Sequence, residues 1–265
     1  MQPADSSTPL PSDGAVGRRF CGRCGQALRD GLCSGCAVQP ALSSRSEDKG
    51  PASLRVALAL YFTLLFTIIA SVAAGWFMED DGFEVKVEIY ASGAICLVAM
   101  AGVALSWARV RPALATQGPL WCYAAAPVIG LATFAIASAA CYLLVTLVGL
   151  EDQSYSVSCL NAGYTWPFVI ALIAVPPAIF EELAFRGVIG SAMEGVFEAR
   201  EAILVTAMMF AILHLSPASF PHLFVVGLAL GVLRRASGSL YPCMILHFTH
   251  NGLVLLSEYL GETSL

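Results

Sequence analysis

The feature that most constrains the fold is a succession of apolar runs that begins at Leu54 and continues almost to the C-terminus. A helix needs about 17–25 mostly apolar residues to cross the hydrocarbon core of a bilayer. Most of the runs reach that length. We therefore predict about seven to eight transmembrane helices, with spans near residues 54–78, 89–108, 120–150, 166–196, 202–215, 223–233 and 240–256.

The composition favours a membrane protein over a soluble one. Hydrophobic residues make up 57% of the chain and charged residues 12%, and the mean hydropathy is +0.74. That charged fraction is about half of what a soluble domain carries, which is too little to solvate a globular surface of this size. The net charge of −5 argues against a nucleic-acid partner. The predicted fold class is an all-α polytopic membrane protein.

Four cysteines precede the apolar runs, as two CxxC pairs separated by eight residues. This spacing supplies four thiolates, the ligand set of a closed tetrahedral structural zinc site. The segment also resembles the small zinc ribbons fused to many bacterial membrane proteins. We predict a disordered N-terminus over 1–17, a zinc ribbon over 18–37, a linker over 38–53 and a transmembrane domain over 54–261. The predicted zinc ligands are Cys21, Cys24, Cys33 and Cys36.

The charged residues near the ends of the apolar runs indicate how the chain is oriented in the membrane. If the spans alternate in direction, nearly all the basic residues fall on the side of the N-terminus, and Lys86 is the one exception. Cytoplasmic loops carry the excess of Lys and Arg, so the N-terminus is expected to be cytoplasmic. The expected location is the inner membrane of a bacterial cell.

Three polar motifs interrupt the apolar runs. Each ionisable group at the centre of a span costs on the order of 3 kcal/mol, so such groups normally face the interior of a helix bundle. We expect the motifs to be functional for this reason. They comprise Glu181, Glu182 and Arg186 in the fourth run, Phe210 and His214 in the fifth, and His247 and Asn251 in the seventh.

The two glutamates are expected to differ in role. Glu182 and Arg186 are four residues apart with the acid N-terminal, which favours a helical ion pair. Glu181 points about 100° away around the helix, so its carboxylate is the freer one and suits proton abstraction from water. Pro176 and Pro177 remove backbone donors one turn earlier. They are expected to kink the helix and open room for water.

The other two motifs carry polar groups that could meet Glu181. If the fourth and fifth runs form an antiparallel hairpin, Glu181 and His214 both lie about 25 Å along their helices from the turn. Phe210 shares a helix face with His214 and is expected to pack beside its ring. His247 and Asn251 are also four residues apart, so together they could donate two hydrogen bonds to one developing oxyanion.

Taken in chain order, the three motifs have the patterns EExxxR, FxxxH and HxxxN. They resemble the motifs of the CAAX prenyl protease and bacteriocin-processing (CPBP) family of intramembrane proteases. The resemblance covers roughly residues 165–255. It implies an intramembrane endopeptidase that hydrolyses a peptide bond of a membrane-associated substrate, CAAX-like or another peptide, with a glutamate-activated water. The implied roles are activation of water by Glu181 and His214, organisation of the site by Glu182 and Arg186, and oxyanion stabilisation by His247 and Asn251.

Other interpretations of the same residues are open at this stage. The charged triplet could be a structural salt bridge. The scaffold could also serve a non-catalytic immunity or binding protein, or a proton-coupled carrier, although a carrier predicts internal repeats that the sequence does not show. Family members are often described as metalloproteases, and two histidines with glutamates could bind zinc. The glutamate-activated water needs no catalytic metal.

Several residues outside the motifs carry further expectations. His222 follows Pro221 and is expected in an outer loop, solvated at the membrane interface. His250 is expected to be a neighbour of the site, although its i, i+3 spacing from His247 would also suit a metal-ligand pair. Gly227 and Gly231 form a GxxxG motif, which predicts close helix packing.

Overall fold

The computed structural model describes residues 51–76, 81–149 and 155–262. The chain divides into two compact units, Met1–Glu47 and Asp48–Leu265, and every described residue belongs to the second. The predicted disordered N-terminus, the four cysteines of the predicted zinc ribbon and most of the predicted linker lie outside the described residues.

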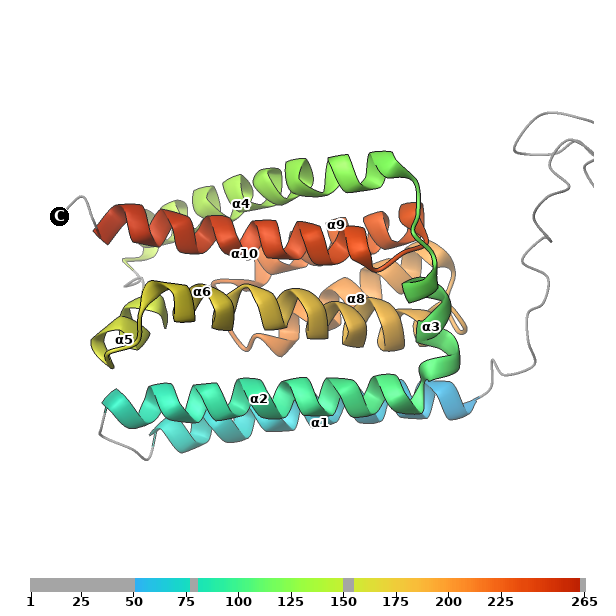
Figure 1. Cartoon of the computed structure of the whole chain (residues 1–265), viewed down its shortest axis with the longest axis horizontal. Helices are drawn as coiled ribbons and strands as arrows, with labels where there is room; N and C mark the ends of the chain where they lie inside the picture. The colour runs from blue at the N-terminus through green and yellow to red at the C-terminus, as the bar shows by residue number, and fades with distance from the viewer. Residues whose placement is uncertain (1–50, 77–80, 150–154, 263–265) are drawn as a thin grey trace, which may run out of the picture. The chain divides into compact units, whose positions relative to one another are not determined.

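The described part of the chain is helical, without a β-strand, and its long helices run side by side (Figure 1). In chain order the helices are α1 (Pro51–Trp76), α2 (Asp81–Leu105), α3 (Trp107–Ala115), α4 (Leu120–Val148), α5 (Tyr155–Asn161) and α6 (Trp166–Ile173), then the π-helical segments η1 (Pro177–Glu181) and η2 (Leu183–Ile189), and then α7 (Gly190–Met193), α8 (Ala199–Leu213), α9 (Phe220–Ser237) and α10 (Tyr241–Glu262).

Every predicted apolar run contains a helix, and the all-α polytopic membrane fold is confirmed. Within the described residues, five helices are long and apolar enough to cross a membrane, fewer than the seven to eight predicted. The remaining two runs are α8, which has 15 residues, and α10, which has 22 residues but includes two histidines, an asparagine and two glutamates. The five candidates are Ala52–Gly75, Val85–Leu105, Leu120–Leu144, Trp166–Met193 and Phe220–Ser237.

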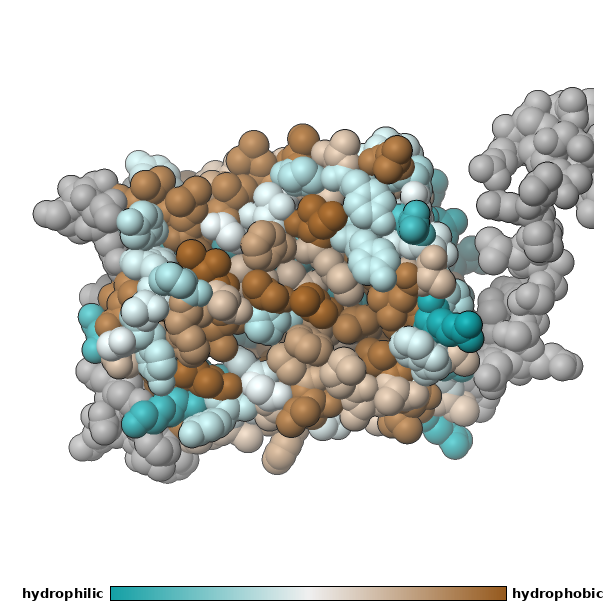
Figure 2. Space-filling view, in the orientation of Figure 1, coloured by the Kyte–Doolittle hydropathy of each residue, from teal (hydrophilic) through white to brown (hydrophobic). Residues whose placement is uncertain are grey.

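The outward-facing side chains are those of a protein solvated by lipid. Leu97 in α2 and Leu120 in α4 are 73% and 86% exposed, and Phe66 in α1 is 72% exposed. Figure 2 shows apolar residues across the middle of the helices and the most hydrophilic residues toward their ends. Large apolar side chains exposed in this number would be unfavourable in water, so the chain is an integral membrane protein.

The fourth predicted run departs from α-helical geometry where the two prolines lie. Proline has no backbone N–H, so Pro177 cannot donate the usual helical hydrogen bond to the carbonyl of Ile173. The α6 helix ends at Ile173, and the π-helical segment η1 begins at Pro177. At Pro176 and Pro177 the chain therefore changes from α-helical to wider π-helical turns, and the kink itself stays a prediction. Such turns often occur at functional sites.

The GxxxG motif brings α9 close to α8, as predicted. A Cβ atom on Gly227 would lie 2.9 Å from the Cα atom of Ala207, and one on Gly231 would lie 2.8 Å from the side chain of Ile203. Both contacts are shorter than real Cβ atoms allow, so the small residues permit the approach. The close packing also presents the backbone carbonyl of Gly227 to the interior of the bundle.

Candidate active site

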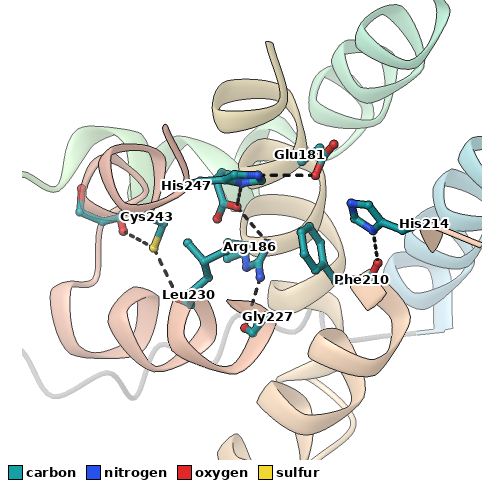
Figure 3. A network of polar contacts seen from close by, with 10 residues as sticks. Glu181, Arg186, Phe210, His214, Gly227, Leu230, Cys243 and His247 are labelled. Carbon is teal, nitrogen blue, oxygen red and sulfur yellow. Dashed lines mark hydrogen bonds and ion pairs between the residues drawn. The ribbon is translucent and has the colours of Figure 1, made fainter. Parts of the chain in front are cut away.

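Glu182 is the centre of a buried ion-pair network. Its side chain is fully buried, at the junction between η1 and η2. Its Oε1 atom accepts one hydrogen bond from Nη1 of Arg186 at 3.0 Å and another from Nδ1 of His247 at 2.8 Å (Figure 3). The ion pair with Arg186 confirms the spacing-based prediction, whereas the bond to His247 joins residues 65 apart in the chain.

Arg186 is held on two further sides. Its Nη2 atom donates to the carbonyl oxygen of Gly227 at 3.2 Å, and its guanidinium carbon lies 4.7 Å from the centre of the Phe210 ring. A buried charge is tolerated when it is paired and its remaining hydrogen bonds are satisfied. We call Glu182, Arg186, His247 and the Gly227 carbonyl the Glu182 network.

Glu181 faces a different environment from its neighbour. It lines a cavity of about 310 Å³, and its side chain is 22% exposed where that of Glu182 is fully buried. Its Oε2 atom lies 4.0 Å from Nε2 of His247 and has no hydrogen-bond partner among the described residues. The two glutamates differ in their partners, as predicted: Oε1 of Glu182 is bound by Arg186 and His247, whereas Glu181 lies beside a cavity, 4.0 Å from Nε2 of His247. The Oε2 atoms of both carboxylates are buried and have no hydrogen-bond partner among the described residues.

Four helical segments form the cavity, which we call the Glu181 cavity. The sequence had indicated the fourth, fifth and seventh apolar runs, and the structure adds α9 from the sixth. The predicted site residues therefore divide into two groups. Glu182 and Arg186 do not line the cavity, and the others do. The polar and aromatic lining residues are Glu181, Phe210, His214, His222, His247, His250 and Asn251.

His214 lies at the C-terminal end of α8, directly after its last residue. Its Nδ1 atom is 2.9 Å from the carbonyl oxygen of Phe210, and its ring centre is 4.9 Å from that of Phe210, so the predicted packing of the two rings is confirmed. A carbonyl oxygen only accepts hydrogen bonds, so Nδ1 carries the proton. In the neutral ring Nε2 is then unprotonated and can accept a proton.

The backbone just after α8 has an unusual conformation at Leu215. Leu215 has a φ of +51°, in the left-handed region that is unfavourable for a residue with a side chain. Its N–H bonds to the carbonyl of Ile212, and Pro217 follows two residues later. This turn separates α8 from α9 directly beside His214, and such strained positions tend to occur at functional sites.

His247 and Asn251 both line the cavity, which confirms that they share a face. Nδ1 of His247 donates to a carboxylate that can only accept, so a neutral His247 leaves Nε2 unprotonated. His247 becomes a hydrogen-bond donor at Nε2 only as an imidazolium. Nδ2 of Asn251 donates to the carbonyl of Ile173 at 3.3 Å. Pro177 has no N–H to donate to that carbonyl, so the amide of Asn251 takes the place of the missing helical hydrogen bond. The amide nitrogen has a second N–H that can donate to another acceptor.

The four histidines of the chain all line this one cavity. The expectation for His222 was wrong, because it lies in the first turn of α9, with a buried Nδ1 atom that has no partner among the described residues. Pro221 early in an apolar run is typical of a helix start, and this pattern could have placed His222 on a helix. His250 is a neighbour, as expected, with its Nδ1 3.0 Å from Oγ1 of Thr133.

A metal site needs several ligand side chains that point toward one position. Among residues 51–76, 81–149 and 155–262, no group of three His, Cys, Asp or Glu side chains is arranged to hold a metal ion. The oxygen of Glu182 that faces His247 is already shared with Arg186. We assign no step of the reaction to a metal ion.

Comparison with known proteins identifies one family. The family model described as "Type II CAAX prenyl endopeptidase Rce1-like" matches residues 163–253, about a third of the chain. The matched range contains all three motifs and every lining residue of the Glu181 cavity named above. This match to a protease family supports the resemblance to the CPBP family. No curated protein and no solved structure gave a significant match.

Proposed function

We propose that the protein is an intramembrane endopeptidase that hydrolyses a peptide bond of a membrane-associated substrate with a water activated by Glu181. One observation carries this proposal. Glu181, His214, His247 and Asn251 come from three separate helical segments and line a single cavity. The family match adds a reason to expect a CAAX-like or related peptide as the substrate.

The first step is attack of water on the scissile carbonyl carbon. The carboxylate of Glu181, which lines the cavity, takes one proton from the water as the new carbon–oxygen bond forms, and the carbonyl electron pair moves onto oxygen. Nε2 of a neutral His214 accepts a second hydrogen bond from the water and orients it. A general base positioned in this way contributes about 10²–10⁴-fold to the rate.

The second requirement is stabilisation of the oxyanion. Nε2–H of a protonated His247 and the second N–H of Asn251 supply two donors on the cavity side. Glu182 accepts from Nδ1 of His247, so it orients the imidazolium and balances its charge. Each donor of this kind is worth about 10²–10³-fold in rate. When the carbon–nitrogen bond breaks, Glu181 returns its proton to the leaving amine, and the products are a carboxylic acid and an amine.

The proposal is tested by comparing membrane proteomes of cells that carry the wild type or Glu181→Gln. An uncleaved precursor should accumulate with Glu181→Gln, and purified wild-type protein in liposomes should cleave it. Glu194→Gln is the matched control, because Glu194 is exposed at the end of the same helical run. If Glu181→Gln keeps the full wild-type phenotype and no precursor accumulates, the protein is a non-catalytic binding or immunity protein.

We also propose that Cys21, Cys24, Cys33 and Cys36 hold a structural zinc ion. The support is their spacing, since these residues lie outside the described part of the chain. Elemental analysis of the purified chain should find one zinc per protein, and a Cys24→Ser, Cys33→Ser double variant should lose it. Cys96→Ser, which changes a cysteine within α2, should keep the zinc. A wild-type protein without zinc would overturn this proposal.

A further inference from the structure

A second, smaller pocket adjoins Glu181 from the other side. It has a volume of about 60 Å³ and lies between α2 and the segment formed by α6 and η1. Ser92 and Cys96 line it from α2, and Leu172 and Pro176 line it from the facing segment. Glu181 lines both this pocket and the Glu181 cavity, so its side chain lies where the two spaces approach each other. We call the smaller space the rear pocket.

The rear pocket has polar groups that can hold water. Pro176 has no N–H to donate to the carbonyl of Leu172, so that carbonyl lacks its usual helical partner. The hydroxyl of Ser92 and the carboxylate of Glu181 add further sites. A buried water needs about 10–15 Å³ and two to four polar partners. The rear pocket therefore has room for a few water molecules beside the carboxylate.

Peptide hydrolysis within a membrane creates a demand for water. Each turnover consumes one water molecule, and a substrate that fills the Glu181 cavity displaces the water there. Cys96 lies near the middle of the candidate span Val85–Leu105, so the rear pocket lies far from both ends of that helix. A second water site on the opposite side of Glu181 meets this demand without competing with the substrate.

We infer that the rear pocket is a water-binding site, open to bulk water, that supplies the hydrolytic water to Glu181 while the substrate occupies the Glu181 cavity. The supply role rests on the proposed function. The presence of water in the rear pocket does not, so the two parts can be tested separately.

The presence of water is tested with the thiol of Cys96. The probe is 2-aminoethyl methanethiosulfonate, a small charged reagent that reacts with thiolates, applied to the full chain in lipid nanodiscs and quantified by peptide mass spectrometry. The matched control is Leu97→Cys in a Cys96→Ala background. Residue 97 is the next residue of α2, at almost the same depth, but its side chain is 73% exposed on the outer surface of the helices.

Thiolates form in water and are strongly disfavoured in lipid, so Cys96 should react about tenfold faster than the cysteine at position 97, or more. Equal rates, or no labelling of Cys96, would overturn the inference. This result does not depend on proteolysis, so it is informative even if the proposed function fails.

The supply role is tested by filling the rear pocket. Ser92→Leu and Cys96→Leu should each lower kcat by about tenfold or more, because the attacking water is displaced from its position. KM should stay near the wild-type value, because neither residue lines the Glu181 cavity. Cys96→Ser keeps the space and should retain kcat. An unchanged kcat in both leucine variants, or a rise in KM that accounts for the loss, would show that the water arrives by another route.

Discussion

Glu181 and Glu182 are adjacent in the chain and lie in opposite surroundings. In the Glu182 network the carboxylate is fully buried and accepts hydrogen bonds from both Arg186 and His247. In the Glu181 cavity the carboxylate is partly exposed, and its Oε2 atom has no partner among the described residues. Oε2 of Glu182 also lacks a hydrogen-bond partner among the described residues, so the two carboxylates differ in two respects. Oε1 of Glu182 is bound by two cationic or polar partners, and only Glu181 lines the cavity.

This difference is the basis for our proposal that Glu182 is structural and Glu181 is catalytic. A buried charge that loses its partner is strongly destabilising, so Glu182 should matter first for folding. The carboxylate of Glu181 has a looser contact, 4.0 Å to Nε2 of His247, and lines a cavity, so it should contribute less to stability and be available to take a proton. His247 belongs to both regions, because Nδ1 bonds to Glu182 and Nε2 faces Glu181. The hydrogen bond to Glu182 therefore fixes the position of the His247 ring beside the cavity.

The largest expected effect is on catalysis. Glu181→Gln should lower kcat for the accumulated precursor by about 10²–10⁴-fold, because the amide cannot take the proton from water. Thermal unfolding should change little, since Oε2 makes no hydrogen bond to the described residues and its ion-pair contact with Nε2 of His247 is long, at 4.0 Å. Cleavage in proteoliposomes and unfolding in detergent measure the two properties. A large loss of stability with intact activity would reverse the roles of the two glutamates.

The second effect is on stability. Arg186→Met should destabilise the protein by about 3–5 kcal/mol, because it leaves the carboxylate of Glu182 buried without its cation. Denaturant titration in mixed micelles measures the change. Arg235→Met is the matched control: Arg235 is exposed near the end of α9, and its loss should change stability by less than about 0.5 kcal/mol. Equal effects of the two variants would show that the network contributes nothing specific.

A third, smaller effect concerns the approach of α9 to α8. Gly227→Ala should cost about 1–3 kcal/mol, because the new Cβ would lie 2.9 Å from the Cα atom of Ala207 and the helices must separate. Separation also moves the carbonyl that accepts from Arg186. Gly252→Ala is the control, because a Cβ atom there meets nothing within 4 Å and α10 should gain helix propensity. The same titration should show no destabilisation for the control.

The smallest effect is expected from Phe210. Phe210→Leu should cost about 0.5–2 kcal/mol, because the guanidinium of Arg186 loses its contact with the ring face and His214 loses its ring neighbour. The activity should also fall modestly as the ring of His214 becomes less well oriented. Phe66→Leu, at a side chain exposed on α1, should leave both unfolding and kcat near the wild-type values. If the two variants behave alike, the Phe210 ring contributes neither to the Glu182 network nor to the orientation of His214.

Local spacing explains which parts of the site were predictable. The ion pair of Glu182 with Arg186 and the ring contact of Phe210 with His214 both join residues four apart, so helical geometry alone brings them together. The prolines also act locally, because a missing N–H disturbs the helix wherever the rest of the chain lies. The expectation for His222 failed because the start of α9 was placed too late, so that an early helical residue was taken for a loop residue.

The sequence by itself determined that this is a helical membrane protein, because apolar runs of membrane-spanning length leave few alternatives, and it determined which polar residues interrupt those runs. The tertiary structure alone decided their partners. The carbonyl of Ile173 meets Asn251, and Glu182 meets His247, across 78 and 65 residues of chain. Such contacts depend on how helices far apart in the sequence pack against each other, which no local spacing determines. That packing gives Glu182 its long-range hydrogen-bond partner and places its neighbour Glu181 beside a cavity.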